Sequence, residues 1–200
     1  MPRPRTDVAA TRRQMLGVAE RLLRQHGARK VTLSDVAAAC GMSQSNAYRF
    51  FASRQALLDA VGDRWFAGIE RELEQIVASN EPPAQQFVRF VARQYEFKRE
   101  RAIEDPELFR ACFALPDAGM TVADRHLNRI RAQMEAILQR CADAGLIGGR
   151  DPAAATELVE ALTERFREPA QILRYAKIDS ARSAAEAAGI ILAGLAHLPR

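Results

Sequence analysis

The stretch that most constrains this fold spans residues 32–51 and reads TLSDVAAACGMSQSNAYRFF. It predicts two short helices joined by a tight turn at Gly41, because glycine supplies the backbone freedom that a sharp turn needs. Thr32 is placed to cap the first helix, and Asp35 follows three residues later, where its carboxylate can reach back to the cap. Ser43 is placed to cap the second helix.

The second of these helices has two different faces. Ala47, Phe50 and Phe51 give it an apolar side for packing. The other side carries amide, hydroxyl, phenol and guanidinium groups, which suit DNA base edges and phosphates, from Gln44, Ser45, Asn46, Tyr48 and Arg49. This is the pattern of a helix-turn-helix whose second helix enters the major groove. A plain helical hairpin with glycine in its turn fits the same pattern.

Charge is distributed unevenly along the chain, although the net charge is only +4. Residues 1–64 hold eleven Lys/Arg and five Asp/Glu, a net charge of +6, and residues 65–200 hold eighteen basic and twenty acidic residues, a net charge of −2. A basic N-terminal third on a slightly acidic body is typical of a phosphate-binding module joined to a part with another task.

The composition favours an all-α fold, because alanine is abundant and strand-like alternating runs are missing. No apolar run reaches membrane-spanning length and no apolar signal segment follows the N-terminus, so we expect a cytoplasmic protein without a membrane partner. Cys40, Cys112 and Cys141 lie far apart and are expected to be free thiols. The sequence contains neither metal-ligand spacing nor a nucleophile–base constellation, so we expect no catalytic residue, metal or cofactor.

We expect about nine helices in two domains. Residues 1–9 are predicted to form a flexible basic arm in which Arg3 and Arg5 are free to approach DNA, residues 10–65 a helix-turn-helix domain, and residues 66–200 a C-terminal helical domain. The first helix is expected over residues 10–26. The fourth is capped by Ser53 and is expected to continue to about residue 77, which is long enough to enter the second domain.

In the second domain, proline, glycine and aspartate mark where helices begin and end. Helical spacing of apolar residues predicts helices over residues 84–101 and 122–144, with a short helix after Asp105 and Pro106. Asp151 is placed to cap a further helix that has Pro152 at its first position and that Pro169 bends or ends. A last helix is expected from about Ser180 to Pro199.

Small or apolar residues occupy nearly all sides of this last helix, so little of it should face water. Burial within one chain would explain this, and so would packing against a two-fold mate, which we favour because DNA readers of this kind bind paired half-sites. The residues expected at such a dimer interface are Leu158, Leu162, Ala184, Ala188, Ile191 and Leu195.

The N-terminal third resembles the tetracycline-repressor (TetR) family of bacterial transcription regulators. The resemblance rests on Gly27, on the pair at 31–32, and on the runs DVAAACGMS (35–43), AYRFF (47–51) and SRQALL (53–58). Order, spacing and residue type agree across some fifty positions. Beyond this third, the chain matches the family in helix count and in its terminal helices, without a shared motif.

The resemblance implies a role for each matching residue. Thr32 and Ser34 would contact phosphate at the start of the second helix, Tyr48 would donate its hydroxyl to a phosphate, and Arg54 would grip another where the family usually has lysine. Phe50 stands where the family often has histidine, which removes one polar contact. The remaining expected DNA contacts, to bases and nearby phosphates, come from Ser43, Gln44, Ser45, Asn46 and Arg49.

These features predict a homodimeric repressor that binds double-stranded DNA at a near-palindromic operator and leaves it when a small-molecule effector binds the C-terminal helices. The expected pocket lining is aromatic or flexible and apolar, which suggests an apolar or aromatic effector: Phe87, Phe90, Tyr95, Phe109, Phe113 and Met134. A plain hydrophobic core also accounts for each of these residues. The alternative function is a DNA-binding dimer without a small-molecule ligand, either controlled by a protein partner or constitutively bound.

Overall fold

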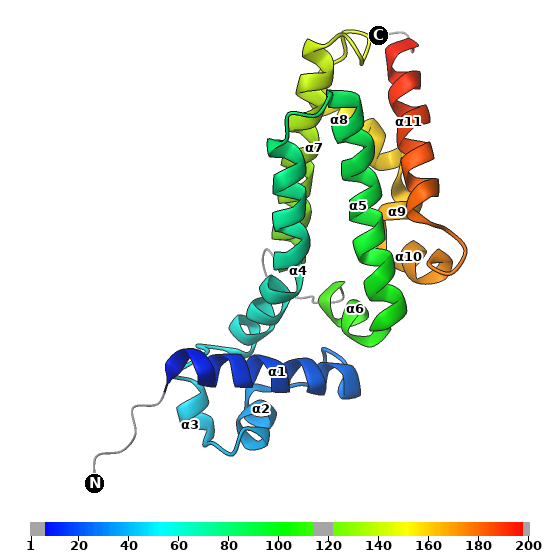
Figure 1. Cartoon of the computed structure of the whole chain (residues 1–200). Helices are drawn as coiled ribbons and strands as arrows, with labels where there is room; N and C mark the ends of the chain where they lie inside the picture. The colour runs from blue at the N-terminus through cyan, green and yellow to red at the C-terminus, as the bar shows by residue number, and fades with distance from the viewer. Residues whose placement is uncertain (1–6, 114–121, 198–200) are drawn as a thin grey trace. The chain divides into compact units, whose positions relative to one another are not determined.

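A computed structural model describes residues 7–113 and 122–197, and Arg3 and Arg5 of the expected arm lie outside these ranges. The described residues form an all-α fold of eleven helices, nine of them seven residues or longer (Figure 1). None of these helices is both long enough and apolar enough to cross a membrane. The chain divides into two compact units, one made of Met1–Phe66 and Glu107–Ala123, the other of Ala67–Pro106 and Asp124–Arg200.

The N-terminal unit contains the predicted helix-turn-helix. Its elements are α1 (Val8–His26), α2 (Leu33–Ala39), α3 (Gln44–Ala47), the first part of α4 (Arg54–Ala78), and α6 (Pro106–Phe113) apart from its first residue. Asp7 caps α1 by accepting from the backbone N–H groups of Ala9 and Ala10 at 3.0 Å, and Gly27 ends the helix with φ of 74°. The end of α1 at Gly27 was predicted, but the helix begins at Val8 and not at residue 10, because Asp7, assigned to the flexible arm, caps it.

The core of the N-terminal unit is aliphatic at one end and aromatic at the other. Leu23, Val36 and Leu57 are almost fully buried. At the other end, the Trp65 ring of α4 makes edge contacts with the rings of Phe109 and Phe113 of α6, at centroid distances of 6.0 and 5.7 Å. These contacts place α6 within the N-terminal unit, although the sequence assigned residues 106–113 to the C-terminal domain.

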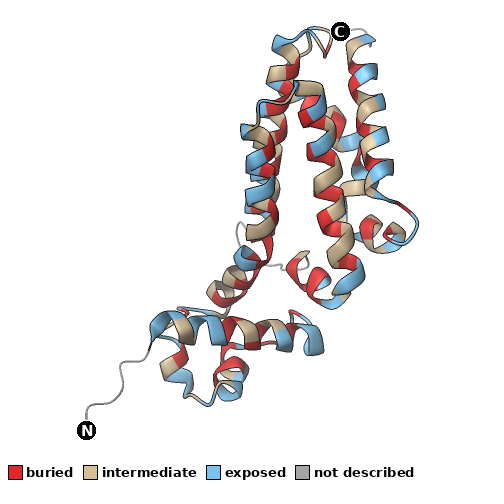
Figure 2. Ribbon diagram, viewed as in Figure 1, coloured by how far each residue is buried: buried red, intermediate tan, exposed pale blue. Residues whose placement is uncertain are grey.

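The C-terminal unit is built around α5 (Pro83–Glu104), which lies between α7 (Val122–Asp143) and α11 (Ala181–His197) in Figure 1. Its buried residues are coloured red on the ribbon of Figure 2. The second part of α4 packs nearby, where the Gln86 amide of α5 donates to the carbonyls of Ile76 and Ser79 at 3.2 and 2.6 Å. α8 (Pro152–Leu162), α9 (Glu164–Arg167) and α10 (Pro169–Tyr175) complete the unit.

The prediction of one helix from Asp151 to about Pro169 was wrong, because α8 ends at Leu162. Thr163 follows with φ of −102° and ψ of 12°, and its hydroxyl donates to the carbonyl of Val159 at 2.6 Å. This local bond competes with continued helix and turns the chain into the short helix α9. The caps at either end were predicted correctly, since Asp151 accepts from Ala154 N–H at 3.0 Å and Pro169 opens α10.

The three cysteines are unbridged, as the sequence predicts. Cys112 and Cys141 are buried and Cys40 is half-buried. Burial raises the pKa of the Cys141 thiol to about 11, so this group stays a protonated thiol near neutral pH.

Candidate nucleic-acid interface

The start of α2 is closed by a reciprocal pair between Thr32 and Asp35. The Thr32 hydroxyl accepts from the Asp35 N–H at 3.1 Å and donates to the Asp35 carboxylate at 2.6 Å, while the Thr32 N–H donates to the same carboxylate at 2.9 Å. The hydroxyl of Thr32, followed by its N–H, holds the pKa of the Asp35 carboxyl below its usual value. Both donors of Thr32 are therefore engaged within the chain, which leaves half-buried Ser34 as the hydroxyl available for phosphate at this helix end.

The second helix of the helix-turn-helix and the turns that follow it, residues 44–51, are here called the recognition element. This element is shorter and tighter than a regular helix. α3 covers only Gln44–Ala47, and the chain then continues in helical turns in which the N–H of Arg49 bonds to Asn46 and that of Phe50 to Ala47, at 3.1 and 2.9 Å. These three-residue spacings are those of a 3₁₀ turn. The sequence predicted one helix through Phe51, so the polar edge is present but its second half has 3₁₀ character.

Most side chains of this element point as the sequence predicts, but Phe50, expected on the packing side, is only half-buried. Ala47 and Phe51 are buried at 0% and 2% exposure, whereas 48% of Tyr48 is exposed. Asn46 is half-buried, and the other predicted base or phosphate contacts of the element are exposed, namely Ser43, Gln44, Ser45 and Arg49. An apolar underside thus holds a row of hydrogen-bonding side chains toward solvent, which is the geometry that readout of base edges requires.

The helix cap at Ser43 ties two of these side chains together. Its hydroxyl accepts from the Asn46 N–H at 3.3 Å and shares a hydrogen bond of 3.1 Å with the Ser45 hydroxyl. Beside the same element, Val8, Asn46, Arg49 and Phe50 line a crevice of about 260 Å³. The start of α1 therefore borders the polar edge, which the sequence did not indicate.

Two arginines position this element from neighbouring helices. Arg12 of α1 donates to the carbonyl of Phe50 at 2.6 Å and lies 4.1 Å above the centre of the Phe51 ring. Arg54 of α4 donates through Nε to the carbonyl of Val31 at 2.7 Å and through Nη2 to the carbonyl of Ala28. The resemblance implied a phosphate contact for Arg54, and the structure adds an internal role in holding the loop between α1 and α2.

Comparison with known proteins decides the family. Residues 83–190, more than half of the chain, match the model described as "Tetracyclin repressor-like, C-terminal domain", and residues 15–61 match "Bacterial regulatory proteins, tetR family". The chain belongs to the TetR family. It is a DNA-binding transcriptional regulator, and regulators of this family are non-enzymatic, as the sequence predicts.

The relatives of this TetR-family regulator agree in fold while differing in sequence. An uncharacterized HTH-type transcriptional regulator of Mycobacterium tuberculosis is 34% identical over 84 residues, which are 42% of this chain and 41% of that relative. SmeT, the repressor of the Stenotrophomonas maltophilia multidrug efflux pump SmeDEF, has a TM-score of 0.71 at 20% identity over 94% of this chain and 91% of its own. A complex of SmeT with triclosan has a TM-score of 0.62 at the same identity, over 84% of this chain and 90% of its own.

FadR from Bacillus subtilis, solved in complex with stearoyl-CoA, has a TM-score of 0.68 at 12% identity. The match covers 90% of this chain and 97% of that protein. At such low identity these structures establish a shared fold over most of the chain.

The six residues expected to line an effector pocket divide between the two units. Phe87, Phe90, Tyr95 and Met134 are buried in the C-terminal unit. Phe109 and Phe113 belong to the aromatic cluster of the N-terminal unit, where their rings lie 4.9 Å apart. The role of these six residues in binding an effector stays a prediction.

The residues expected at a dimer interface also separate into two groups. Ala184, Ala188 and Leu195 are buried at 0%, 0% and 1% exposure, because this face of α11 packs against α5 within the same chain. They are therefore absent from the free surface. Leu162 is 56% exposed, and Leu158 and Ile191 are half-buried.

The free side of α11 carries apolar groups of its own. Ile190 is 74% exposed, and it is followed by the exposed small residues Ala193 and Gly194. On α8, Ala154, Ala161 and Leu162 are exposed. These two helices are in contact, and each carries exposed apolar side chains.

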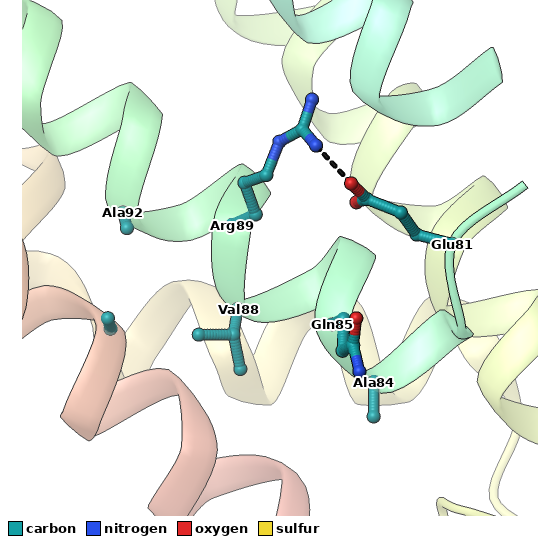
Figure 3. Close-up of a pocket in the computed structure, with 7 residues that line it drawn as sticks. Glu81, Ala84, Gln85, Val88, Arg89 and Ala92 are labelled. Atoms are coloured by element: carbon teal, nitrogen blue, oxygen red, sulfur yellow. Dashed lines mark hydrogen bonds and ion pairs between the residues drawn. The ribbon is translucent and has the colours of Figure 1, made fainter. Parts of the chain in front are cut away.

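A separate groove runs between α5 and α11. It encloses about 470 Å³, and Figure 3 shows Ala84, Val88 and Ala92 of α5 along it, with the ion pair of Glu81 and Arg89 at its rim. A neighbouring hollow of about 290 Å³ continues past Ala84 and Val88 to Gly189 of α11. None of the six residues expected to line the effector pocket borders either hollow.

Proposed function

We propose that this regulator is a homodimeric repressor that binds a near-palindromic operator and is released from it by a small, mainly apolar molecule. The observation that carries the DNA-binding half is the exposed edge of Gln44, Ser45, Tyr48 and Arg49 above the buried Ala47. In a two-fold dimer, two such edges enter successive major grooves roughly 34 Å apart. The operator is then a pair of inverted half-sites.

The exposed apolar surface of α8 and α11 supports dimerisation. A monomer would leave Leu162 and Ile190 largely in water, at 56% and 74% exposure. Isologous contact of this surface with its own copy would bury both side chains and bring together four helices, two from each chain. Large exposed apolar side chains that gather into a patch mark interaction sites, which makes these two residues candidates for one.

Two relatives support a small-molecule effector. SmeT has been solved with triclosan and FadR with stearoyl-CoA, and both ligands have large apolar parts. The apolar interior of the C-terminal unit, including Phe87, Phe90 and Met134, suits ligands of that character. An effector releases the operator only if it binds the DNA-free conformation more tightly than the DNA-bound one.

Tyr48→Phe tests the DNA-binding half. The operator is first selected from a library of genomic fragments, and affinity is then measured by fluorescence anisotropy at fixed salt concentration. Loss of one hydroxyl–phosphate hydrogen bond should weaken binding by roughly 3–10-fold, since such a bond contributes about 0.5–1.5 kcal/mol. Wild-type affinity should also fall steeply as salt increases, because arginine–phosphate contacts release counterions.

Unchanged operator affinity in Tyr48→Phe would remove this hydroxyl from the contacts. Failure of the wild-type protein to select any genomic fragment over a scrambled duplex would overturn the operator-binding proposal as a whole. The melting temperature of the variant, measured without DNA, should equal that of the wild type because the Tyr48 ring is about half exposed.

A further inference from the structure

Two buried glutamines on α5 differ sharply in how they are hydrogen-bonded. Gln86 is 0% exposed; its amide nitrogen donates to the Ser79 carbonyl at 2.6 Å, and its oxygen accepts from Arg140 at 3.0 Å. Gln94, two turns later, is 3% exposed, and within the described part of the chain neither its amide nitrogen nor its oxygen has a hydrogen-bond partner. A buried amide without partners destabilises the folded state, so native proteins rarely keep one without a functional reason.

Gln94 lies among residues that define a chemical environment. Helical spacing places Phe87 and Phe90 on the same face before it and Lys98 one turn after it. The Lys98 side chain is 2% exposed and its Nζ donates to the Arg167 carbonyl at 3.0 Å. The face therefore carries two aromatic rings toward one end and, one turn apart toward the other, a buried amide and a buried amine.

Tyr95 does not belong to this face. Its hydroxyl also has no partner among the described residues, but its ring meets that of Phe166 at a centroid distance of 5.1 Å. It points about one quarter-turn away from Gln94 around the helix axis. Gln94 and Lys98 lie four residues apart on α5, so helical spacing places both on the face that carries Phe87 and Phe90.

We infer that Gln94 and Lys98 form the headgroup site of the effector, and that the effector is an apolar carboxylic acid. Its carboxylate accepts from the Gln94 amide and pairs with the Lys98 ammonium, while its apolar body lies against Phe87 and Phe90. Burial lowers the pKa of the Lys98 amine to about 7, so an anion beside it would also favour the charged form of the amine. This inference rests on the proposed function for the existence of an effector, and it names the chemical class of that effector.

The first test compares Gln94→Leu with Gln86→Leu in thermal unfolding without ligand or DNA. Gln94→Leu should raise the melting temperature by roughly 2–4 °C, because it removes an unsatisfied buried amide at little change in shape. Gln86→Leu is the matched control on the same helix; it should lower the melting temperature because its partners lose their bonds. A fall in Gln94→Leu comparable to that in Gln86→Leu would show a structural role and overturn the inference.

The second test uses pairs of acids and alcohols with the same apolar body: decanoate with decanol, hexadecanoate with hexadecanol, and naphthoate with naphthalenemethanol. Binding to the full-length protein is measured by the shift in melting temperature and by titration calorimetry. At least one acid should bind about tenfold or more tightly than its alcohol, and Lys98→Met and Gln94→Leu should each abolish this preference. Equal binding of every pair, or no binding by any acid, overturns the inference.

These measurements use protein without DNA, so they separate the inference from the proposed function. If the protein prefers an acid but binds no operator, the headgroup site is supported and the repressor proposal is contradicted. If the protein binds its operator and binds acids and alcohols with equal affinity, the repressor proposal is supported and the headgroup site is contradicted.

Discussion

Arg54, for which the family resemblance implies a phosphate contact, has a structural role within the fold. Its guanidinium donates to the carbonyls of Val31 and Ala28, so it fastens the loop that leads into the cap of α2. The two bonds come from different nitrogens of a rigid plane, whereas a lysine ammonium has its three donors on one nitrogen and could bond both carbonyls only if they came close to that single atom. The family resemblance placed a positive charge here for DNA, whereas the structure explains why the charge is carried by arginine.

Arg54→Lys should therefore destabilise the protein even when no DNA is present. Loss of one of the two hydrogen bonds should cost about 1–2 kcal/mol, which lowers the melting temperature by roughly 3–6 °C. Arg13→Lys, at an exposed position of α1, is the matched control and should unfold like the wild type. If Arg54→Lys unfolds like the wild type while its operator affinity falls, Arg54 acts on phosphate alone.

Residue-scale features that depend on neighbours in the chain were predicted correctly from the sequence. The caps at Thr32, Ser43 and Asp151 each use a side chain that reaches a backbone N–H three residues away. Arg12 was missed as a support of the recognition element because its partner, the Phe50 carbonyl, lies 38 positions away. Such a contact exists only after the helices have packed, so local spacing carries no signal for it.

At the scale of elements, α4 and the start of α7 approach each other at Gly62. A β-carbon built on Gly62 would lie 2.4 Å from Cγ1 of Val122, a distance that atoms in contact do not reach. Val122 is 2% exposed and β-branched, so its side chain has little freedom to move aside. Glycine in the middle of a long helix is thus explained by close packing of these two helices.

Gly62→Ala should destabilise the protein by about 1–3 kcal/mol, because the clash outweighs the gain in helix propensity of roughly 1 kcal/mol. Gly68→Ala, on the same helix with no atom within 4 Å of the new carbon, should stabilise it by up to about 1 kcal/mol. Denaturant unfolding measures both. Adding Val122→Ala to Gly62→Ala should recover part of the loss, and additive losses in the double variant would disprove the contact.

Element types were predicted far better than element limits in the second half of the chain. α5 and α7 follow from apolar spacing, but the break at Thr163 does not, because Leu158 and Phe166 keep helical spacing across it. The helix ends where the Thr163 hydroxyl bonds to the Val159 carbonyl, and beyond the break the Arg167 carbonyl accepts from Lys98 of α5. The six residues expected to line a pocket were grouped because all are aromatic or flexible and apolar. The structure divides them between two units, because α6, which carries Phe109 and Phe113, packs on α4.

For the whole molecule, the sequence left open whether α11 is covered by its own chain or by a second copy. The structure shows cover by the same chain for one face and leaves another face exposed. Ala184 and Ala188 meet α5, since small residues allow close approach, while Ile190 on another face is 74% exposed. A helix that is small or apolar on all sides gives no periodic signal that separates these two faces. Dimerisation is therefore expected through Ile190 and Leu162, with the buried alanines unavailable.

Ile190→Asp combined with Leu162→Asp should convert the protein to a monomer at micromolar concentration. A charge at the centre of a buried apolar interface loses its hydration without gaining a partner, which costs several kcal/mol per dimer. Multi-angle light scattering after size-exclusion chromatography measures the mass directly. Ile103→Asp, which replaces another exposed isoleucine on α5, serves as the control and should keep the wild-type mass.

The same double variant links oligomeric state to DNA binding. A monomer presents one recognition element, so it contacts only one half-site. It therefore lacks the gain in affinity that comes from linking two recognition elements in one dimer. Its affinity for the full operator should fall by about a hundredfold or more and approach its affinity for an isolated half-site. A variant of dimer mass would place the interface elsewhere, and a monomer with wild-type operator affinity would show that one copy reads the site alone.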